Sequence, residues 1–149
     1  MAKDEMKIKL SDFSHTNVVI DNSLLAKAFL EEEESDFVRK LLKMGLNYQV
    51  NIMAPSLIFF ELVNVLSKAL KDPDKTMLAL NRFKKFVISI VDPEMKTVSE
   101  ILKDVCSKKI SYYDASYHAL AKDFDATFLT ADREYYEIMK DRGNIMLLE

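Results

Sequence analysis

The chain has 149 residues, enough for one domain, with 49% hydrophobic residues, 30% charged residues and a formal net charge of −3. This composition is typical of a soluble globular protein and excludes a nucleic-acid binder that relies on a strongly basic surface. The single cysteine, Cys106, excludes an intramolecular disulfide and a multi-cysteine metal site. The sequence shows no secretion signal and no apolar run that could span a bilayer, so we expect a cytoplasmic protein with no membrane partner.

Glycine and histidine are scarce in this chain. Its two glycines are Gly45 and Gly143, and its two histidines are His15 and His118. A glycine-rich phosphate loop or a dinucleotide-binding turn needs several glycines close together. The sequence therefore argues against nucleotide binding by either kind of loop, and two histidines are a poor basis for a zinc site.

The N-terminal part of the chain predicts a polar segment, a strand and a helix. Residues 1–16 are mostly polar and charged, which predicts a tail or an edge strand. Val18–Ile20 is apolar and β-branched, as expected of a buried parallel strand. Ser23 is placed to cap the helix predicted over Leu24–Leu30.

The rest of the chain continues to alternate between strands and helices. The acidic run Glu31–Glu34 is typical of a solvated helix start. Further helices are predicted from Phe37 and over residues 55–70, 75–86, 92–106, 112–123 and 132–142, and strands over 49–53, 87–91, 126–130 and 145–148. This alternation predicts an α/β fold, a three-layer α/β/α sandwich around a mostly parallel sheet.

Four acidic residues fall where this fold could bring them together. Asp21 directly follows the first strand, and Asp132 follows the strand over 126–130, at the edge of the sheet where ligands bind. Glu61 lies in a very apolar helix, where an unpaired carboxylate is costly. Asp114 begins a helix among tyrosines. Taken singly, each has a structural alternative, as a helix cap, a first-turn charge or a solvated position on its helix.

If the four acids converge, their chemistry points to a metal ion. Carboxylates in one cleft repel each other, and a hard divalent cation relieves the repulsion. Oxygen-only ligands favour Mg²⁺ or Mn²⁺, which implies metal-assisted hydrolysis of a phosphodiester. Ser23, Thr130 and Asn22 are then candidates for supporting groups that orient the ligands or water.

Four segments resemble a PIN domain, and within it the VapC-type toxin ribonucleases: "VVIDNSLLAKAFL", "PSLIFFELVNVLSKAL", "SYYDASYHALAKDFDATFLTADREYYE" and "GNIMLL". The resemblance covers about Asn17 to Glu149, giving a nuclease domain over 17–149 after the segment 1–16. It implies an α/β/α sandwich, Mg²⁺- or Mn²⁺-dependent endoribonuclease activity, a homodimer and often an antitoxin partner. The family acids correspond to Asp21, Glu61, Asp114 and Asp132, with hydroxyls at Ser23 and Thr130.

Three basic residues near these acids are candidates for contacts with RNA phosphates: Lys108, Lys109 and Arg133. Ordinary solvated surface is an equal alternative for each. Tyr112, Tyr113 and Tyr117 could stack on bases, although we expect at least one of them in the core. His118 stands where the family commonly has an aliphatic residue, and we expect it to pack inside the protein rather than line the site.

Three functions stay open at this level. The leading one is a metal-dependent endoribonuclease that acts as a toxin. A housekeeping RNA-processing nuclease could carry the same residues, and a non-catalytic RNA- or protein-interaction module could use the same fold. A phosphatase or phospho-acceptor is disfavoured, because Ser23 stands where such a phosphatase needs a second aspartate and no paired acids follow the first strand.

Overall fold

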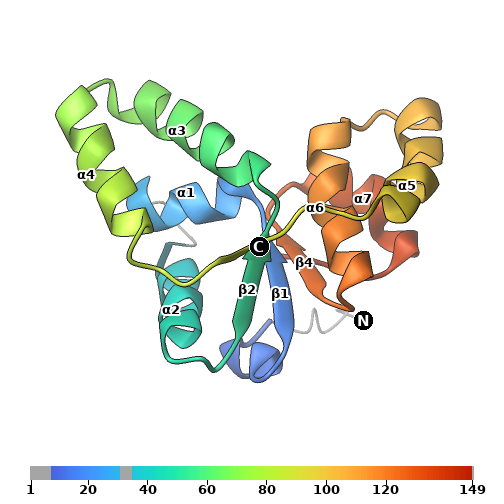
Figure 1. Cartoon of the computed structure of the whole chain (residues 1–149), viewed down its shortest axis with the longest axis horizontal. Coiled ribbons are helices and arrows are strands. Elements are labelled where there is room, and N and C mark those ends of the chain that lie inside the picture. Colours follow the sequence, from blue (N-terminus) through green and yellow to red (C-terminus); the bar gives the residue numbers. More distant parts are fainter. Residues whose placement is uncertain (1–7, 31–34, 149) are drawn as a thin grey trace, which may run out of the picture.

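The computed structural model describes residues 8–30 and 35–148, which form one parallel sheet flanked by helices (Figure 1). Within these residues five strands follow the order β3-β2-β1-β4-β5, and each neighbouring pair is parallel. The predicted fold class is therefore confirmed. The strands are β1 (Asn17–Ile20), β2 (Asn51–Ala54), β3 (Ser89–Ile90), β4 (Thr127–Thr130) and β5 (Ile145–Leu147).

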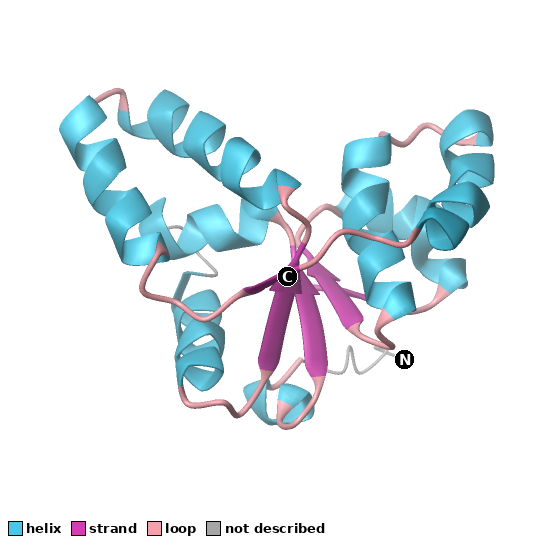
Figure 2. Ribbon diagram, viewed as in Figure 1, coloured by secondary structure: helices cyan, strands magenta, loops and turns pink. Residues whose placement is uncertain are grey.

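Helices cover both faces of the sheet. In Figure 1, α1 to α4 lie on one side of the strands and α5 to α7 on the other, and the strand arrowheads in Figure 2 point between the two groups. Within the described ranges, no helix combines the length and apolar character needed to cross a membrane. The helices are α1 (Asn22–Leu30), α2 (Ser35–Leu46), α3 (Leu57–Leu70), α4 (Pro73–Phe83), α5 (Met95–Ser107), α6 (Tyr112–Asp123) and α7 (Arg133–Met139), with 3₁₀ helices η1 (Leu10–Phe13) and η2 (Lys140–Arg142).

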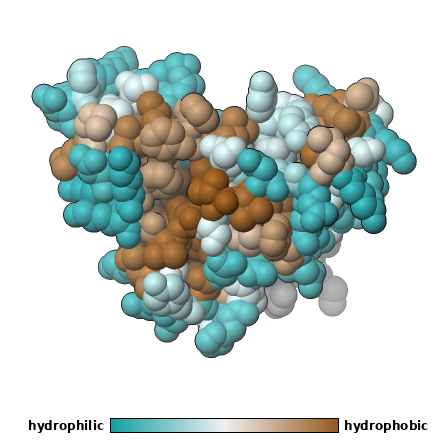
Figure 3. All heavy atoms as spheres, in the orientation of Figure 1, coloured by the Kyte–Doolittle hydropathy of each residue, from teal (hydrophilic) through white to brown (hydrophobic). Residues whose placement is uncertain are grey.

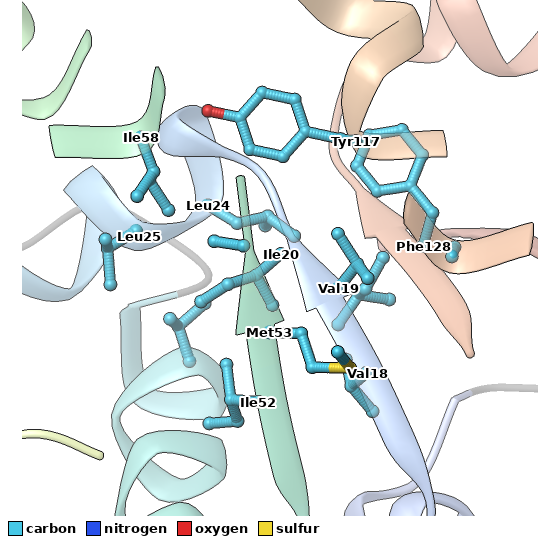
Figure 4. Packing of buried hydrophobic residues seen from close by; sticks show 14 of the residues in the cluster. Val18, Val19, Ile20, Leu24, Leu25, Ile52, Met53, Ile58, Tyr117 and Phe128 are labelled. Carbon is cyan, nitrogen blue, oxygen red and sulfur yellow. The ribbon is translucent and has the colours of Figure 1, made fainter. Parts of the chain in front are cut away.

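The central strand β1 determines where a ligand site can form. Val18, Val19 and Ile20 are fully buried, because helices cover both faces of the sheet. β1 pairs with β2 on one side and with β4 on the other. The strand order reverses at this point, and ligands of such sheets bind outside the carboxyl ends of the strands there. Figure 4 shows the surrounding core, with Tyr117 and Phe128 side by side.

The strand predicted over Val87–Val91 is wrong in extent, since only Ser89 and Ile90 form β3. β3 is an edge strand that pairs with β2 alone, and Ile90 is exposed. An apolar run at an edge can pair on one side only. Just beyond it, the Asp92 carboxylate accepts hydrogen bonds from the backbone N–H and hydroxyl of Ser56, which holds the start of α3 near β3.

The described part of the N-terminal segment is helical rather than an edge strand. Residues 10–13 form η1, whose Phe13 side chain is buried and meets the ring of Phe37 edge-on at 6.3 Å. The expectations for residues 1–7 and for Glu31–Glu34 lie outside the described residues. The interpretation of 1–16 as a separate segment stays a prediction.

Candidate functional site

The ends of β1 and β4 are joined by one buried hydroxyl. Thr130 is the last residue of β4, and its Oγ1 donates a hydrogen bond of 2.8 Å to Asp21 Oδ2. Thr130 Oγ1 also accepts a hydrogen bond of 3.0 Å from the backbone N–H of Asp132. Asp21 directly follows β1, and its chain separation from Thr130 is 109 residues. Two of the predicted acids therefore share a partner at the point where the strand order reverses.

Asp21 is the N-terminal cap of α1. Its Oδ1 accepts hydrogen bonds from the backbone N–H of Leu24 at 2.9 Å and from the hydroxyl of Ser23 at 2.8 Å. The expectation that Ser23 caps the helix is thus wrong, because Ser23 lies inside the first turn and donates to Asp21 instead. Burial raises the pKa of Asp21 and the nearby charge of Asp114 adds to the effect, while these hydrogen bonds oppose it.

Glu61 faces the same acids from α3. Its Oε1 accepts a hydrogen bond of 2.5 Å from the hydroxyl of Tyr117 on α6. Burial raises the pKa of Glu61, the Tyr117 hydrogen bond opposes the rise, and repulsion from Asp114 and Asp21 adds to it. Asp21, Glu61 and Asp114 therefore lie close enough for each carboxylate charge to affect the others.

Asp114 and Asp132 line a small surface pocket of about 140 Å³. The Ser111 hydroxyl donates to Asp114 Oδ2 at 2.9 Å and accepts the backbone N–H of Asp114, so Ser111 caps α6. Asp132 caps α7 through the backbone N–H of Tyr135. The other lining residues are Lys109, Ile110, Ser111, Glu134 and Tyr135.

The four carboxylates do not form a ready-made metal cage. Within residues 8–30 and 35–148, no three Asp, Glu, His or Cys side chains are grouped closely enough to hold an ion. Each of the four instead makes a hydrogen bond within the protein. Their chemistry nevertheless fits a hard cation, because the donors are all oxygens. Burial is the main cause of the raised pKa values of Asp21 and Glu61, and repulsion from Asp114, which a cation would relieve, adds to it.

The predicted supporting and RNA-binding residues differ in their surroundings. Asn22 is buried at the start of α1, and its Oδ1 has no hydrogen-bond partner among the described residues. Lys109 lines the pocket with Asp114, whereas Lys108 pairs with Asp104, which is not part of that lining, at 3.2 Å. Arg133 is exposed at the first position of α7. Their roles stay predictions.

His118 packs in the interior, as expected. Its Nε2 lies 2.7 Å from the carbonyl oxygen of Gly143, which can only accept, so Nε2 carries the proton. Nδ1 then accepts from the Tyr135 hydroxyl at 3.0 Å. Burial lowers the pKa of His118, which keeps the ring neutral. Its two hydrogen bonds tie α6 to α7 and to the turn before β5.

Two hydrogen bonds to the proposed acids, Tyr117–Glu61 and Ser111–Asp114, were not predicted from the sequence. The second had a local signal, since a serine three residues before an aspartate at a helix start is a common cap. The Tyr117–Glu61 hydrogen bond joins residues 56 positions apart. The only sequence signal for it was the spacing of Asp114 and Tyr117 on one predicted helix. Of the three tyrosines considered for base stacking, Tyr117 is in the core and Tyr113 is 62% exposed.

Replacing Thr130 with valine is expected to destabilise the protein by about 1–3 kcal/mol, because it leaves a buried Asp21 oxygen and the Asp132 N–H without their partner. Valine keeps the shape of threonine, so packing changes little. Thr130→Ser retains the hydroxyl and is the matched control. Urea unfolding measures both variants, and equal stability of valine and serine variants would contradict the role of this hydroxyl.

The fold and the strand-end acids define a three-layer α/β protein with an acidic site at the switch point of its sheet. A profile of the PIN domain matches residues 18–140, most of the chain. The chain belongs to the PIN domain family. No curated protein sequence matches it significantly.

Three solved structures share this fold. VapBC2 from Rickettsia felis, bound to a DNA fragment from its promoter, matches with a TM-score of 0.66 and 19% identity over 90% of this chain and 98% of that one. PAE2754 from Pyrobaculum aerophilum matches with a TM-score of 0.59 and 20% identity, over 83% of this chain and 86% of that one. VapC20 from Mycobacterium tuberculosis is a toxin that cleaves the sarcin-ricin loop. It matches with a TM-score of 0.54 and 11% identity, over 71% of this chain and 82% of that one. VapC proteins are therefore among the structural neighbours of this chain.

Proposed function

We propose that this chain is a Mg²⁺- or Mn²⁺-dependent endoribonuclease that hydrolyses RNA phosphodiester bonds in the cytoplasm, as the toxin of a VapBC-type toxin–antitoxin pair. One observation carries the proposal: at the switch point of a PIN-domain sheet the Thr130 hydroxyl joins the Asp21 carboxylate to the backbone of Asp132, and Asp114 lies near enough for its charge to act on Asp21 and Glu61. A site of that kind gains stability from a divalent cation. The likeness to VapC20, a toxin that cleaves an RNA loop, supports the substrate class.

In this proposal the metal ligands and catalytic residues are Asp21, Glu61, Asp114 and Asp132. A bound divalent cation supplies charge neutralisation and an activated water for attack on the phosphodiester. The hydroxyls of Ser23 and Thr130 hold the Asp21 carboxylate in one orientation. Because Glu61 and Asp114 lie on helices from opposite sides of the sheet, the fold presents carboxylates to an ion from two directions (Figure 1).

The negative net charge is compatible with an RNA substrate. The formal charge of the chain is −3, and four of its negative charges belong to the proposed metal ligands. The remainder is therefore slightly positive. Lys109, in the pocket with Asp114 and Asp132, is the best placed cation for a phosphate contact. Arg133 directly follows Asp132 in the chain, whereas Lys108 pairs with Asp104.

The proposed partners are a second copy of this chain and an antitoxin protein. The helices α3 and α4 expose large apolar side chains, and on the face shown in Figure 3 apolar residues gather beside these helices. An apolar groove of about 270 Å³ lies there. Exposed apolar patches on soluble proteins commonly mark protein interfaces. The large apolar side chains exposed on α3 and α4 are Phe59, Phe60, Met77 and Leu78. The groove is lined mainly by Phe59, Phe83, Phe86, Ile88 and Ile90.

The test is RNA cleavage by the purified protein with Mn²⁺ or Mg²⁺. Cleavage is expected to stop with EDTA and to fall at least about 100-fold in Asp114→Asn, because the substitution removes a proposed metal ligand without changing its size. Asp36→Asn, at an exposed aspartate paired with Lys40 in α2, is the control and is expected to cleave normally. Undiminished cleavage in EDTA or in Asp114→Asn would overturn the assignment.

A non-catalytic module is the second candidate, because each of the four carboxylates already has a partner within the protein. Millimolar Mn²⁺ separates the two functions. A nuclease site is expected to raise the melting temperature by preferential binding to the folded state, whereas a module gives no shift and no cleavage. Growth arrest upon expression, relieved by Asp114→Asn, distinguishes a toxin from a housekeeping nuclease.

A further inference from the structure

We propose that Tyr117 is a positioning residue for Glu61: its hydroxyl holds one oxygen of the carboxylate and leaves the other free to bind the divalent cation. The inference rests on the proposed function. It adds a residue outside the four acids, and the two residues come from different helices. Tyr117 lies on α6 and Glu61 on α3, which flank opposite faces of the sheet (Figure 1).

The hydrogen bond has the geometry of a strong, charge-assisted one. Tyr117 Oη donates to Glu61 Oε1 at 2.5 Å, within the range for a hydroxyl bound to a carboxylate. Tyr117 is three residues after Asp114, so both residues lie on the same side of α6. Figure 4 shows the hydroxyl pointing away from α6, towards Ile58 of α3 and the start of α1.

The position of this hydroxyl is fixed by the core. The Tyr117 side chain is only 1% exposed, and its ring stacks on Phe128 of β4 with centroids 6.0 Å apart and planes 16° from parallel. A ring packed in this way cannot turn its hydroxyl elsewhere without disturbing the core. The phenol is therefore a donor that is in place before any ligand arrives.

Glu61 needs such a partner more than the three aspartates do. Its longer side chain has more rotamers to lose upon ordering, and it reaches the acids from a helix that packs mainly on α1 and α4. α6 packs instead on α5, β1 and β4. The Tyr117 hydroxyl bridges these two groups of helices and sets the direction from which Glu61 faces Asp114.

Tyr117 acts through Glu61 rather than on the RNA. Its ring is buried and its hydroxyl is already committed to the carboxylate, so it has no free face for a base or a phosphate. Groups that hold a metal ligand in this way typically change metal affinity by about 10–100-fold when they are removed.

The test is the Mn²⁺ dissociation constant of Tyr117→Phe, measured on the RNA-free protein by electron paramagnetic resonance of free Mn²⁺. The variant removes only the hydroxyl and keeps the stacked ring. We expect binding about 10–100-fold weaker than in the wild type. In a Glu61→Ala background, the same substitution is expected to change the dissociation constant less than about twofold, since the two residues act as a unit.

Thr76→Val is the matched control. It removes another buried hydroxyl, which donates to the carbonyl oxygen of Asp72 in α4, away from the proposed ligands. It is expected to lower the melting temperature and to leave Mn²⁺ binding unchanged, so a general effect of losing a buried hydrogen bond is separated from a loss of positioning.

Three further outcomes separate the inference from the proposed function. Wild-type affinity in Tyr117→Phe, together with lost binding in Asp21→Asn, overturns the role of Tyr117 and leaves the metal site standing. Equal weakening by Tyr117→Phe with or without Glu61 also overturns it. A wild-type protein that binds no Mn²⁺ and cleaves no RNA overturns the proposed function and the inference with it.

Discussion

Asp21→Asn is expected to abolish metal-dependent RNA cleavage while it stabilises the metal-free protein. Asp21 is partly buried near Asp114, and this burial raises the pKa of its carboxyl above the ordinary value of 3.8. The folded state therefore binds the proton more tightly than the unfolded state, and stability is lost as pH rises from 3.8 through the folded pKa. Asparagine is neutral and keeps an oxygen for the Leu24 N–H.

We expect a gain of about 1 kcal/mol in the unfolding free energy at pH 7 in EDTA, and a loss of at least about 100-fold in cleavage. The gain should shrink as pH falls and the wild-type carboxyl becomes protonated. Urea unfolding at a series of pH values measures the stability effect. With Mn²⁺ added, the wild type should become more stable than Asp21→Asn, because only the wild type retains the carboxylate ligand.

Asp72→Asn is the matched control for this substitution. Asp72 also caps a helix, α4, through the backbone N–H groups of Asp74 and Lys75, but it lies outside the proposed site. Asparagine caps nearly as well as aspartate, so cleavage and stability are expected to change little. If Asp21→Asn destabilises the metal-free protein, or cleaves RNA like the control, Asp21 is a structural cap and not a strained ligand.

The largest loss of stability is expected from Phe128→Ala, about 3–5 kcal/mol. Phe128 is 1% exposed at the centre of β4, and its ring meets those of Tyr117, His118 and Tyr135 at 6.0, 5.9 and 5.9 Å. Alanine leaves a cavity beside the rings that make the Tyr117–Glu61 and His118–Tyr135 hydrogen bonds. Total stabilities of domains are about 5–15 kcal/mol, so the variant should be close to unfolding.

Chemical denaturation of Phe128→Ala measures this loss directly. Phe60→Ala is its control, because Phe60 is 71% exposed on α3 and its replacement is expected to change stability by less than about 0.5 kcal/mol. A loss below about 1 kcal/mol in Phe128→Ala would mean that the aromatic cluster contributes little to the fold.

Local sequence patterns were enough to predict most of the sheet. The β-branched run Val18–Ile20 predicted a buried parallel strand, and the regular alternation of strands and helices predicted a mostly parallel sheet, and both are confirmed. The same reasoning overextended Val87–Val91, since composition does not tell an edge strand from a central one. It offered both Ser23 and Asp21 as caps, because either residue suits a helix start and the choice depends on where the chain leaves the sheet.

For the site, strand ends were informative and long-range contacts were not. Parallel strands share one carboxyl edge, so the positions of Asp21 and Asp132 followed from the chain order. The contacts of Tyr117 with Glu61 and of His118 with Tyr135 depend on how helices pack across the sheet, which periodicity does not encode. The four-acid metal site itself stays a prediction, because a ligand set is a property of side-chain rotamers and of the bound ion.

The pairing of β1 with β4 also determines when the site can exist during protein synthesis. Asp21 is made early, but the hydroxyl that orients it belongs to a residue 109 positions later. A nascent chain on the ribosome therefore carries its acids apart until β4 has emerged and closed this long loop, a slow kind of contact to form. If the proposed substrate is RNA, this order of synthesis would delay assembly of the site until β4 has left the ribosome.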